Sequence, residues 1–276
     1  MIREETAEVA GKTAEERVDP LDRGLHYGDG LFETLRVDGG RIPFLPWHAD
    51  RLREGCRRLN LPWPGHFLAQ AEALAARHPR AVLKFLYTAG PGERGYRRSR
   101  NRPVSRWFVS GLPPETAEPG LRVRWCRHRL AHQPALAGIK HLNRLDQVLA
   151  RAEWEDEFDE GILCDFQGHP VEGVQSNLFW VRDGVLHTPP LDACGVAGVL
   201  RRAVLAWAAR EGLAISEAYQ PPASLLGAEE VFLTNSVRGI QPVLRLETRT
   251  WQPGPLARRF AARLEALRQG KEALPA

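Results

Sequence analysis

Lysine is the residue type that this chain uses most selectively, and its amine can do covalent chemistry. Of the 38 basic residues four are lysines and the remaining 34 are arginines, so arginine fills nearly every ordinary surface role. A lysine amine, with a reference pKa of roughly 10.4, can lose its proton when burial and nearby charge lower that value, whereas a guanidinium stays charged. The lysines that remain are therefore candidates for a nucleophile.

Two of the four lysines are placed where a site could form. Lys12 and Lys271 fall in polar terminal stretches and can be set aside. Lys84 lies within an apolar, alternating segment, where it could point to solvent or pair with a carboxylate. Lys140 stands between small or apolar residues and the start of a long predicted helix. The pattern alone leaves both internal lysines open.

A glycine-rich run suggests a different chemistry, but its context argues against it. Gly90, Gly92 and Gly95 match the GxGxxG pattern of dinucleotide-binding turns. In such a turn the last glycine opens a helix that holds the pyrophosphate, whereas here YRRSRNRP follows and ends in a helix breaker. The arginines, with Tyr96 and Trp107, could bind nucleic acid through phosphates and stacking. We favour a solvated loop, or one that meets substrate carboxylates.

Composition and charge indicate a globular protein of one large or two modest domains. The 276 residues are 43% hydrophobic and 26% charged, with a net charge of +4 that comes from arginines spread along the chain. There is no apolar run long enough to cross a bilayer, and the N-terminal stretch lacks the apolar core of a secretory signal. We therefore expect a cytoplasmic protein without a membrane partner.

The four cysteines do not suggest a metal site or a disulfide framework. Cys56, Cys126, Cys164 and Cys194 lie far apart, without a CxxC pair and without a histidine at metal-ligand spacing. No metal is expected.

Hydrophobic periodicity predicts a mixed chain of strands and helices. A glycine-punctuated loop at 22–30 leads into the first strand. In the N-terminal half we predict strands at 31–37, 42–45, 81–88 and 104–110 and helices at 47–59 and 67–77. In the C-terminal half we predict strands at 121–126, 161–165, 178–181 and 230–234 and helices at 144–155, 199–210 and 256–267. The proline-rich, aperiodic stretch 111–120 is predicted to be a linker. It would separate an N-terminal α/β domain at 1–110, with a polar leader at 1–17, from a C-terminal domain at 121–276.

The segment KHLNRLDQVLAR, which begins at Lys140, resembles the cofactor-lysine signature of the 4-amino-4-deoxychorismate lyases. These enzymes belong to fold-type IV of the pyridoxal-phosphate enzymes, together with branched-chain and D-amino-acid aminotransferases. Further motifs match in the same order: RGLHYGDGLFET, HADRL, VEGVQSNLFW, GVAGVLR and EVFLTNS. The resemblance extends from about Leu21 to Val243, and the stretch before Val18 departs from the family.

The resemblance implies an α+β fold with a smaller N-terminal α/β domain, a larger C-terminal pseudo-barrel domain and a homodimer. It implies pyridoxal 5'-phosphate as a Schiff base on Lys140. Arg51 would meet the cofactor phosphate. Glu172 would face the pyridine nitrogen and keep it protonated. The remaining phosphate contacts would come from one helix start and one hydroxyl: the backbone N–H groups of Val199 and Leu200, and Ser236.

The resemblance also implies positions for substrate contacts. Phe32 stands where D-amino-acid aminotransferases carry a tyrosine, so that activity is disfavoured. Thr34 follows the pattern of the lyases and could position or transfer a proton. Arg94 and Tyr96 match positions near the substrate carboxylate in relatives, and Asn235 is a further candidate.

The implied reaction converts 4-amino-4-deoxychorismate to 4-aminobenzoate and pyruvate, a step towards folate, with Lys140 as cofactor anchor and general base. A class-IV aminotransferase is the alternative within the family, but Phe32 and the HLNRLDQ run favour the lyase. A nucleic-acid-binding protein is the rival from another class; it predicts salt-dependent oligonucleotide binding and no bound chromophore. We expect a small-molecule substrate and no nucleic-acid partner.

Overall fold

The computed structural model describes residues 18–98, 102–114 and 119–275, and the chain divides into two compact units. Unit 1 comprises Met1–Leu112 and Ile139–Asn143, and unit 2 comprises Pro113–Gly138 and Arg144–Ala276. The segment around Lys140, which the sequence assigned to the C-terminal domain, thus groups with unit 1. The polar leader 1–17 lies outside the described residues, and the predicted domain limits stay a prediction.

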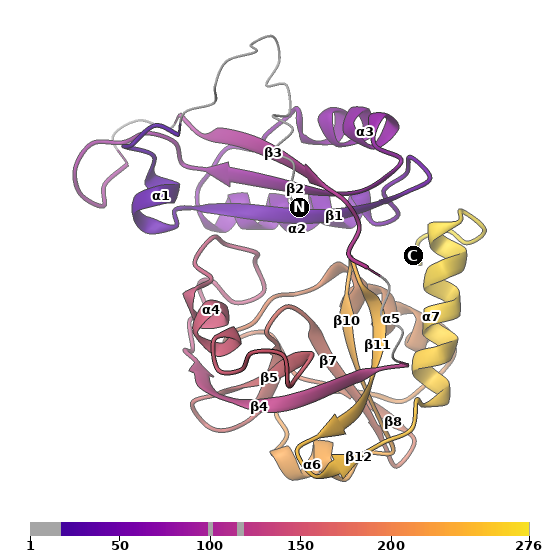
Figure 1. Ribbon diagram of the computed structural model, residues 1–276. Coiled ribbons are helices and arrows are strands. Elements are labelled where there is room, and N and C mark those ends of the chain that lie inside the picture. Colours follow the sequence, from indigo (N-terminus) through magenta and orange to yellow (C-terminus); the bar gives the residue numbers. More distant parts are fainter. Residues whose placement is uncertain (1–17, 99–101, 115–118, 276) are drawn as a thin grey trace. The chain divides into compact units, whose positions relative to one another are not determined.

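Unit 1 is built on an antiparallel sheet of three strands within its described part, in the order β1 (Gly30–Asp38), β2 (Arg80–Thr88) and β3 (Val104–Ser110) (Figure 1). Helix α2 (Leu45–Arg58) packs against β1, and α3 (Phe67–Arg77) packs against β2. Along β1 the odd-numbered residues from Leu31 to Val37 are buried and the alternate ones are half-buried. One face of the sheet is therefore covered by helices.

Two local predictions for unit 1 are wrong. Residues 42–45 do not form a strand, because Leu45 already begins α2. A proline occupies the first turn of α2, where proline is tolerated because the N–H groups of that turn make no hydrogen bonds within the helix. The loop expected at 22–30 contains a short helix, α1 (Arg23–Tyr27). The Asp22 side chain accepts a hydrogen bond from Gly24 N–H at 2.8 Å, and Gly28 ends the helix in the left-handed conformation.

Unit 2 contains a closed barrel, which confirms the predicted barrel-like sheet. Its described residues form a nine-stranded sheet in which β10 pairs with both β11 and β7, so that six strands close in the order β10, β11, β4, β5, β6 and β7. These strands are β4 (Leu121–Leu130), β5 (Glu160–Asp165), β6 (Pro170–Gly173), β7 (Asn177–Arg182), β10 (Glu230–Asn235) and β11 (Gly239–Leu246). Strands β8 (Val185–Thr188), β9 (Ile215–Glu217) and β12 (Arg249–Thr250) extend the sheet.

The residues of the barrel core show which side chains of β10 point into the barrel. One cluster of buried apolar residues joins side chains from strands around the ring, among them Leu178, Val231 and Leu233. Side chains that meet from all sides of a closed ring must lie inside it. Because side chains alternate along a strand, Phe232 and Thr234 face outward. Helix α5 (Val199–Arg210) packs against β10.

The other helices of unit 2 are α4 (Leu145–Arg151), α6 (Pro222–Leu226) and α7 (Pro255–Arg268). Helix α4 is shorter than the predicted helix 144–155. The Glu153 carboxylate accepts hydrogen bonds from the N–H groups of Arg127 and His128 on β4, both at 2.8 Å, and Trp154 is buried. These tertiary contacts end the helix, which local propensity could not indicate.

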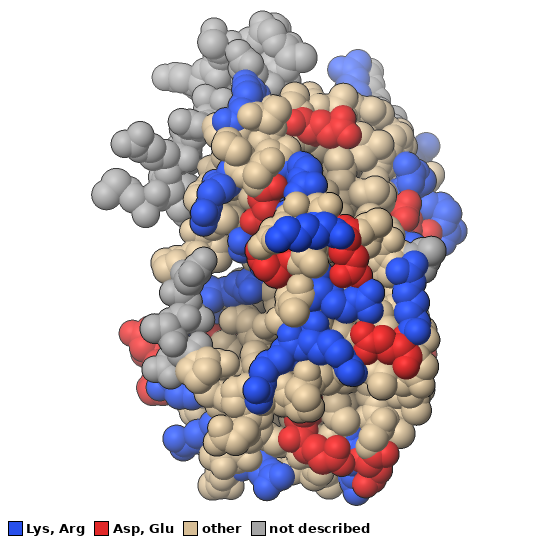
Figure 2. Space-filling view, turned by 90° about the vertical axis from the view of Figure 1, so that its right-hand side faces the viewer, with Lys and Arg blue, Asp and Glu red and all other residues tan. Residues whose placement is uncertain are grey.

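The described residues show three further features. The four cysteines are free and buried. No cluster of three or more acidic, histidine or cysteine side chains in the described ranges is arranged to hold a metal ion, and no described helix is long and apolar enough to span a membrane. Figure 2 shows a face on which acidic side chains lie among the basic ones.

Candidate active site

The segment that carries Lys140 runs beside the free edge of β1. The N–H of Phe32 donates to the carbonyl of Lys140 at 2.9 Å, and the N–H of Leu142 donates to the carbonyl of Gly30 at 3.0 Å. Strand β1 is the edge strand of its sheet, so these bonds satisfy backbone groups that would otherwise be open. Lys140 is therefore fixed in register with the motif RGLHYGDGLFET.

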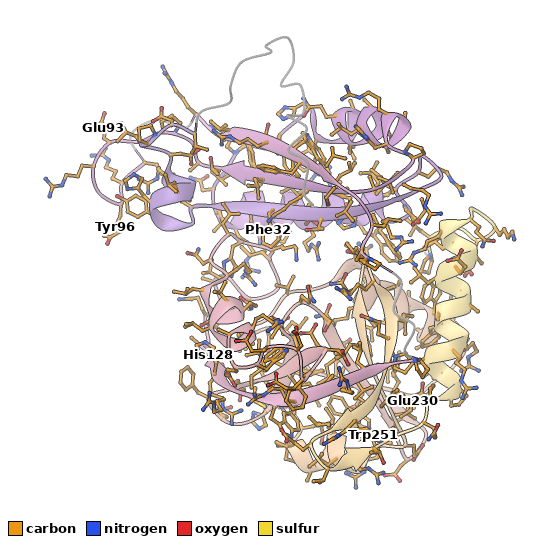
Figure 3. All side chains as sticks on the ribbon, viewed as in Figure 1. Phe32, Glu93, Tyr96, His128, Glu230 and Trp251 are labelled. Atoms are coloured by element: carbon orange, nitrogen blue, oxygen red, sulfur yellow. The ribbon has the colours of Figure 1, made fainter. Side chains whose placement is uncertain are left out.

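The amine of Lys140 lies over the ring of Phe32. Its Nζ is 4.5 Å from the ring centroid, and Nζ of Lys84, on β2, is 5.4 Å from the same centroid. Lys84 is paired with Thr34 in the register of β1 and β2. Phe32, which Figure 3 labels, and Thr34 both alternate with the residues buried under α2, so the strand pattern places them on the other face of the sheet. The structure thus brings Lys140 close to Phe32 and places Lys84 on the same face as Thr34.

Arg51, the predicted phosphate ligand, is bound by a buried carboxylate that the sequence analysis missed. From α2, Arg51 Nε donates to Oε1 of Glu33 at 2.8 Å and its terminal nitrogen donates to Oε2 at 2.5 Å. His48 Nδ1 lies 2.7 Å from the same Oε2, and Glu33 is 1% exposed. The FET and HADRL motifs contain these residues, but their contact depends on β1 facing α2.

The protonation states of this cluster follow from the balance between burial and the charges and hydrogen bonds within it. Burial alone would raise the pKa of Glu33, but the Arg51 charge and the hydrogen bonds from Arg51 and His48 lower it to about 2. Burial lowers the pKa of His48, the Glu33 carboxylate opposes this, and the charges of Arg51 and Lys140 lower it further. Glu33 is therefore ionised and His48 neutral at pH 7, so Nδ1–H of His48 donates to the carboxylate.

Arg94 and Tyr96 lie in a loop that is anchored to α1. Arg23, the first residue of α1, donates to the carbonyls of Gly95 and Tyr96 at 3.0 and 2.8 Å. The Tyr96 ring packs on that of Tyr27, with centroids 5.4 Å apart, and Tyr96 is 85% exposed (Figure 3). No helix follows Gly95 in the described residues before β3, so the GxGxxG run is not a dinucleotide turn.

In unit 2, Glu172 is a buried acid on β6 whose position is fixed by the backbone. It is 4% exposed, and its Oε2 accepts a hydrogen bond from the N–H of Val196 at 2.9 Å. Gln147 Nε2 lies 3.5 Å from the other oxygen. Burial lowers the pKa of Arg144, whereas the negative charge of Glu172 raises it. Glu172 is thus a fixed carboxylate with a cation beside it.

The start of α5 is held by the side chain of Asn177. Its Nδ2 donates to the carbonyl of Val196 at 2.7 Å, and its Oδ1 accepts from the N–H of Gly198 at 3.1 Å. No side chain caps α5, so the N–H groups of its first turn, those of Val199 and Leu200, remain for an anion. Val196 links this helix start to Glu172, and the structure therefore brings these predicted residues together.

At the end of β10, the side chain of Thr234 faces outward, on the side of the barrel where α5 packs. Thr234 is paired with Asn177, is 2% exposed, and its Oγ1 is buried without a hydrogen-bond partner among the described residues. An unsatisfied buried hydroxyl is costly, and a ligand oxygen would satisfy it. Thr234 was not among the residues predicted from the sequence, although the motif EVFLTNS contains it.

The two residues after Thr234 are the predicted ones. Asn235 uses its amide within the unit: Nδ2 donates to the carbonyl of Gln175 at 2.5 Å, and Oδ1 accepts from Val237 N–H at 2.9 Å. Ser236 follows, half-buried. Their roles toward substrate and phosphate stay predictions.

Comparison with known proteins identifies the family. A family model described as amino-transferase class IV matches residues 30–246, which span the Lys140 segment, β1, the barrel strands and α5. The chain belongs to this family. The class IV match covers most of both units, and the closed barrel with its smaller α/β unit is the fold-type IV architecture.

Relatives within the class IV family include both lyases and aminotransferases. An aminodeoxychorismate lyase of Vibrio harveyi is 36% identical over 80% of this chain and 84% of its own length. A putative branched-chain-amino-acid aminotransferase of Methanocaldococcus jannaschii is 32% identical, with 87% of each chain covered. The crystal structure of 4-amino-4-deoxychorismate lyase from Pseudomonas aeruginosa is 45% identical, with a TM-score of 0.84 over 91% of this chain and 96% of that one.

Proposed function

We propose that this protein is a pyridoxal-phosphate-dependent lyase that converts 4-amino-4-deoxychorismate to 4-aminobenzoate and pyruvate. The observation that carries the proposal is the placement of Lys140, whose backbone is paired to β1 and whose amine stands over Phe32. Membership of the class IV family and the similarity to named aminodeoxychorismate lyases, at 36% and 45% identity, support the choice of reaction.

The residues of each unit fit a part of the cofactor. In unit 1, Lys140 provides an amine for the aldehyde and Arg51 a cation for the phosphate. In unit 2, the uncapped first turn of α5 and the unsatisfied hydroxyl of Thr234 are suited to a phosphate, and the buried carboxylate of Glu172 is suited to a protonated pyridine nitrogen.

When bound, pyridoxal phosphate supplies an electron sink that stabilises negative charge on the substrate carbon next to the amine. Glu172 holds the proton at the pyridine nitrogen, because a fixed carboxylate favours the protonated form. The Nζ of Lys140 removes the proton from the amine-bearing carbon as a general base. Thr34, which shares a face of the sheet with Phe32, would orient a proton. Breakage of the bond between the ring carbon and the enolpyruvyl ether oxygen then expels enolpyruvate, which takes up a proton at its methylene carbon to become pyruvate. The ring is left as the aromatic 4-aminobenzoate.

An aminotransferase is the second candidate, because a relative of 32% identity carries that name and the same cofactor site would serve both reactions. Phe32 favours the lyase, since it lacks the phenol of D-amino-acid aminotransferases. The test supplies the purified holoenzyme with 4-amino-4-deoxychorismate, and separately with D-alanine or leucine plus 2-oxoglutarate. We expect 4-aminobenzoate to form much faster than any transamination product; the opposite ranking contradicts the proposal.

Assembly and location are part of the same proposal. Helix α4 exposes three apolar side chains at helical spacing, Leu145, Val148 and Leu149, which are 67%, 60% and 49% exposed. Such a stripe on a short helix suits burial against a second copy of the chain. We propose a homodimer that acts in the cytoplasm on a small-molecule substrate; light scattering of the purified protein measures its mass against the 30.9 kDa of one chain.

A further inference from the structure

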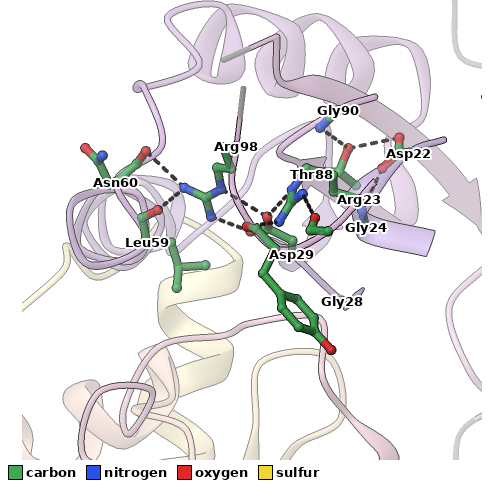
Figure 4. Close-up of polar contacts among 12 residues, drawn as sticks. Asp22, Arg23, Gly24, Gly28, Asp29, Leu59, Asn60, Thr88, Gly90 and Arg98 are labelled. Carbon is green, nitrogen blue, oxygen red and sulfur yellow. Dashed lines mark hydrogen bonds and ion pairs between the residues drawn. The ribbon is translucent and has the colours of Figure 1, made fainter. Parts of the chain in front are cut away.

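Asp29 is a largely buried carboxylate that binds two arginines at once (Figure 4). Arg23 Nε donates to its Oδ2 at 2.8 Å, and Arg98 Nε donates to the same oxygen at 3.0 Å, while a terminal nitrogen of Arg98 reaches Oδ1. The Asp29 side chain is 12% exposed and that of Arg23 is 5% exposed. Burial would raise the pKa of Asp29, but the hydrogen bonds and charges of Arg98 and Arg23 lower it. The carboxylate is therefore ionised at pH 7.

Each arginine uses its remaining donors on a different backbone segment. Arg23 donates to the carbonyls of Gly95 and Tyr96. Arg98 donates to the carbonyls of Leu59 and Asn60, just beyond the end of α2. Asp29 thus connects the start of β1 with the loop around Tyr96 and with the end of α2.

Two glycines of this loop allow close contacts, Gly92 with α1 and Gly90 with the backbone of Arg102. A Cβ on Gly92 would lie 2.9 Å from Cδ of Arg23, and a Cβ on Gly90 would lie 1.8 Å from the carbonyl oxygen of Arg102. The N–H of Arg23 also donates to the carbonyl of Gly90 at 2.9 Å. Gly90 and Gly92 of the GxGxxG run, rejected as a nucleotide motif, therefore have a packing reason, whereas a Cβ on Gly95 would meet nothing within 4 Å and that residue has a positive φ of 98°.

The clamp, meaning Asp29 with Arg23 and Arg98, supports an exposed aromatic side chain. The guanidinium of Arg23 lies 4.9 Å from the ring centroid of Tyr27, on which Tyr96 packs. The same arginine therefore contacts both the backbone at Tyr96 and the ring beneath it. A buried ion cluster that fixes an exposed ring is the arrangement expected where a binding residue is held in place before its ligand arrives.

We propose that Asp29 is a positioning residue for substrate binding. Through Arg23 it fixes the backbone at Gly95 and Tyr96, and through Arg98 it ties the end of the same loop to the end of α2. Arg94 and Tyr96 would then meet the substrate carboxylate without having to be ordered first. The inference rests on the proposed function for the identity of the substrate. The fixing of the loop itself rests on the contacts above.

The test compares Asp29→Asn with wild-type holoenzyme. Asparagine keeps the size but removes the charge and turns one acceptor into a donor that faces two guanidinium groups. The matched control is Asp38→Asn, which removes an acid at the other end of β1 that pairs with Arg36 at 2.9 Å. Two readouts are used: native trypsin cleavage at Arg94 and Arg97, mapped by mass spectrometry, and the steady-state constants for 4-amino-4-deoxychorismate.

For Asp29→Asn we expect cleavage in the loop to rise at least about tenfold, with cleavage in unit 2 unchanged, because the loop backbone has lost its anchor. KM should rise at least about tenfold while kcat changes by less than about threefold, since substrate binding must now order the loop. The visible absorbance of the bound cofactor and the midpoint of its absorbance titration should be the same as in wild type. Asp38→Asn should match wild type in loop cleavage, in KM and kcat, and in the absorbance and titration of the cofactor.

Other outcomes distinguish a failure of the positioning role from a failure of the clamp or of the proposed function. Faster loop cleavage with an unchanged KM overturns the positioning role, and unchanged cleavage in a folded variant overturns the clamp. If Asp29→Asn does not fold, Arg98→Lys, which keeps the charge but loses the fork of donors, takes its place with the same two requirements. If wild type shows no lyase turnover but the cleavage pattern is as expected, the proposed function fails and the clamp stands.

Discussion

Replacing Glu33 by glutamine removes the buried counter-charge of Arg51 with almost no change in side-chain volume. The pKa of Glu33 is lowered from 4.5 to about 2, a difference of about 2.5 units. At 1.36 kcal/mol per unit, this corresponds to about 3 kcal/mol of folding free energy. The figure lies at the lower end of the range, about 3–5 kcal/mol, for removing one partner of a buried ion pair.

The pH dependence has a definite sign. Because the folded-state pKa of Glu33 is below its unfolded value of 4.5, its stabilising contribution is complete above that pH. The contribution is lost as the pH falls from 4.5 towards 2, where the carboxylate becomes protonated in the folded state as well. The difference in unfolding free energy between wild type and Glu33→Gln should therefore be constant at neutral pH and shrink progressively in acid.

The measurement is urea denaturation of cofactor-free protein across this pH range, with hydrogen exchange of β1 and α2 peptides to report on unit 1. Asp38→Asn is the control, because it breaks a half-buried pair with Arg36 on the same strand and should cost at most about 1 kcal/mol. A Glu33→Gln protein that is no less stable than the control would show that Glu33 does not stabilise the fold through its charge. So would a stability difference that does not change with pH.

Two further changes test the cofactor contacts of unit 2. Gly198→Ala would place a Cβ 2.0 Å from Oδ1 of Asn177, so we expect it to displace the start of α5 and raise the dissociation constant for pyridoxal phosphate by at least about tenfold, measured by absorbance titration. Gly65→Ala, whose Cβ would meet nothing within 4 Å, should leave that constant unchanged, and equal effects of the two would contradict the contact. Glu172→Gln should keep the cofactor bound but lower lyase turnover on the order of 100-fold, because the fixed charge is lost; normal turnover would exclude its role.

The elements that could be predicted from the sequence are those whose pattern is decided locally. Helices 67–77 and 199–210 and strand 104–110 lie where periodicity placed them. The helix expected to run to 155 ends at Arg151 because Glu153 binds the backbone of β4, a contact distant in sequence. The expected strand 42–45 is replaced by a helix start that prolines favour.

Some residues of the candidate site could likewise be predicted from the sequence, whereas others depend on contacts between distant elements. Lys140 could be found because lysine is scarce in this chain and because a motif surrounds it. Glu33 and His48 become site residues because β1 contacts α2 and buries them together. Thr234 becomes one because it is paired with Asn177 between β10 and β7. These relations appear only when strands and helices are placed in space. A single sequence therefore indicates the reactive amine of Lys140 more readily than residues such as Glu33, His48 and Thr234, whose roles depend on contacts between distant elements.

Lys84 is the alternative to Lys140 as the residue that carries the cofactor, because its amine also lies near the ring of Phe32. Borohydride reduction of the holoenzyme, followed by peptide mapping, shows directly which amine is attached. We predict the cofactor mass on the peptide that contains Lys140, loss of visible cofactor absorbance in Lys140→Ala, and retention of that absorbance in Lys84→Ala. A reduced adduct on Lys84, or full absorbance in Lys140→Ala, would contradict the account.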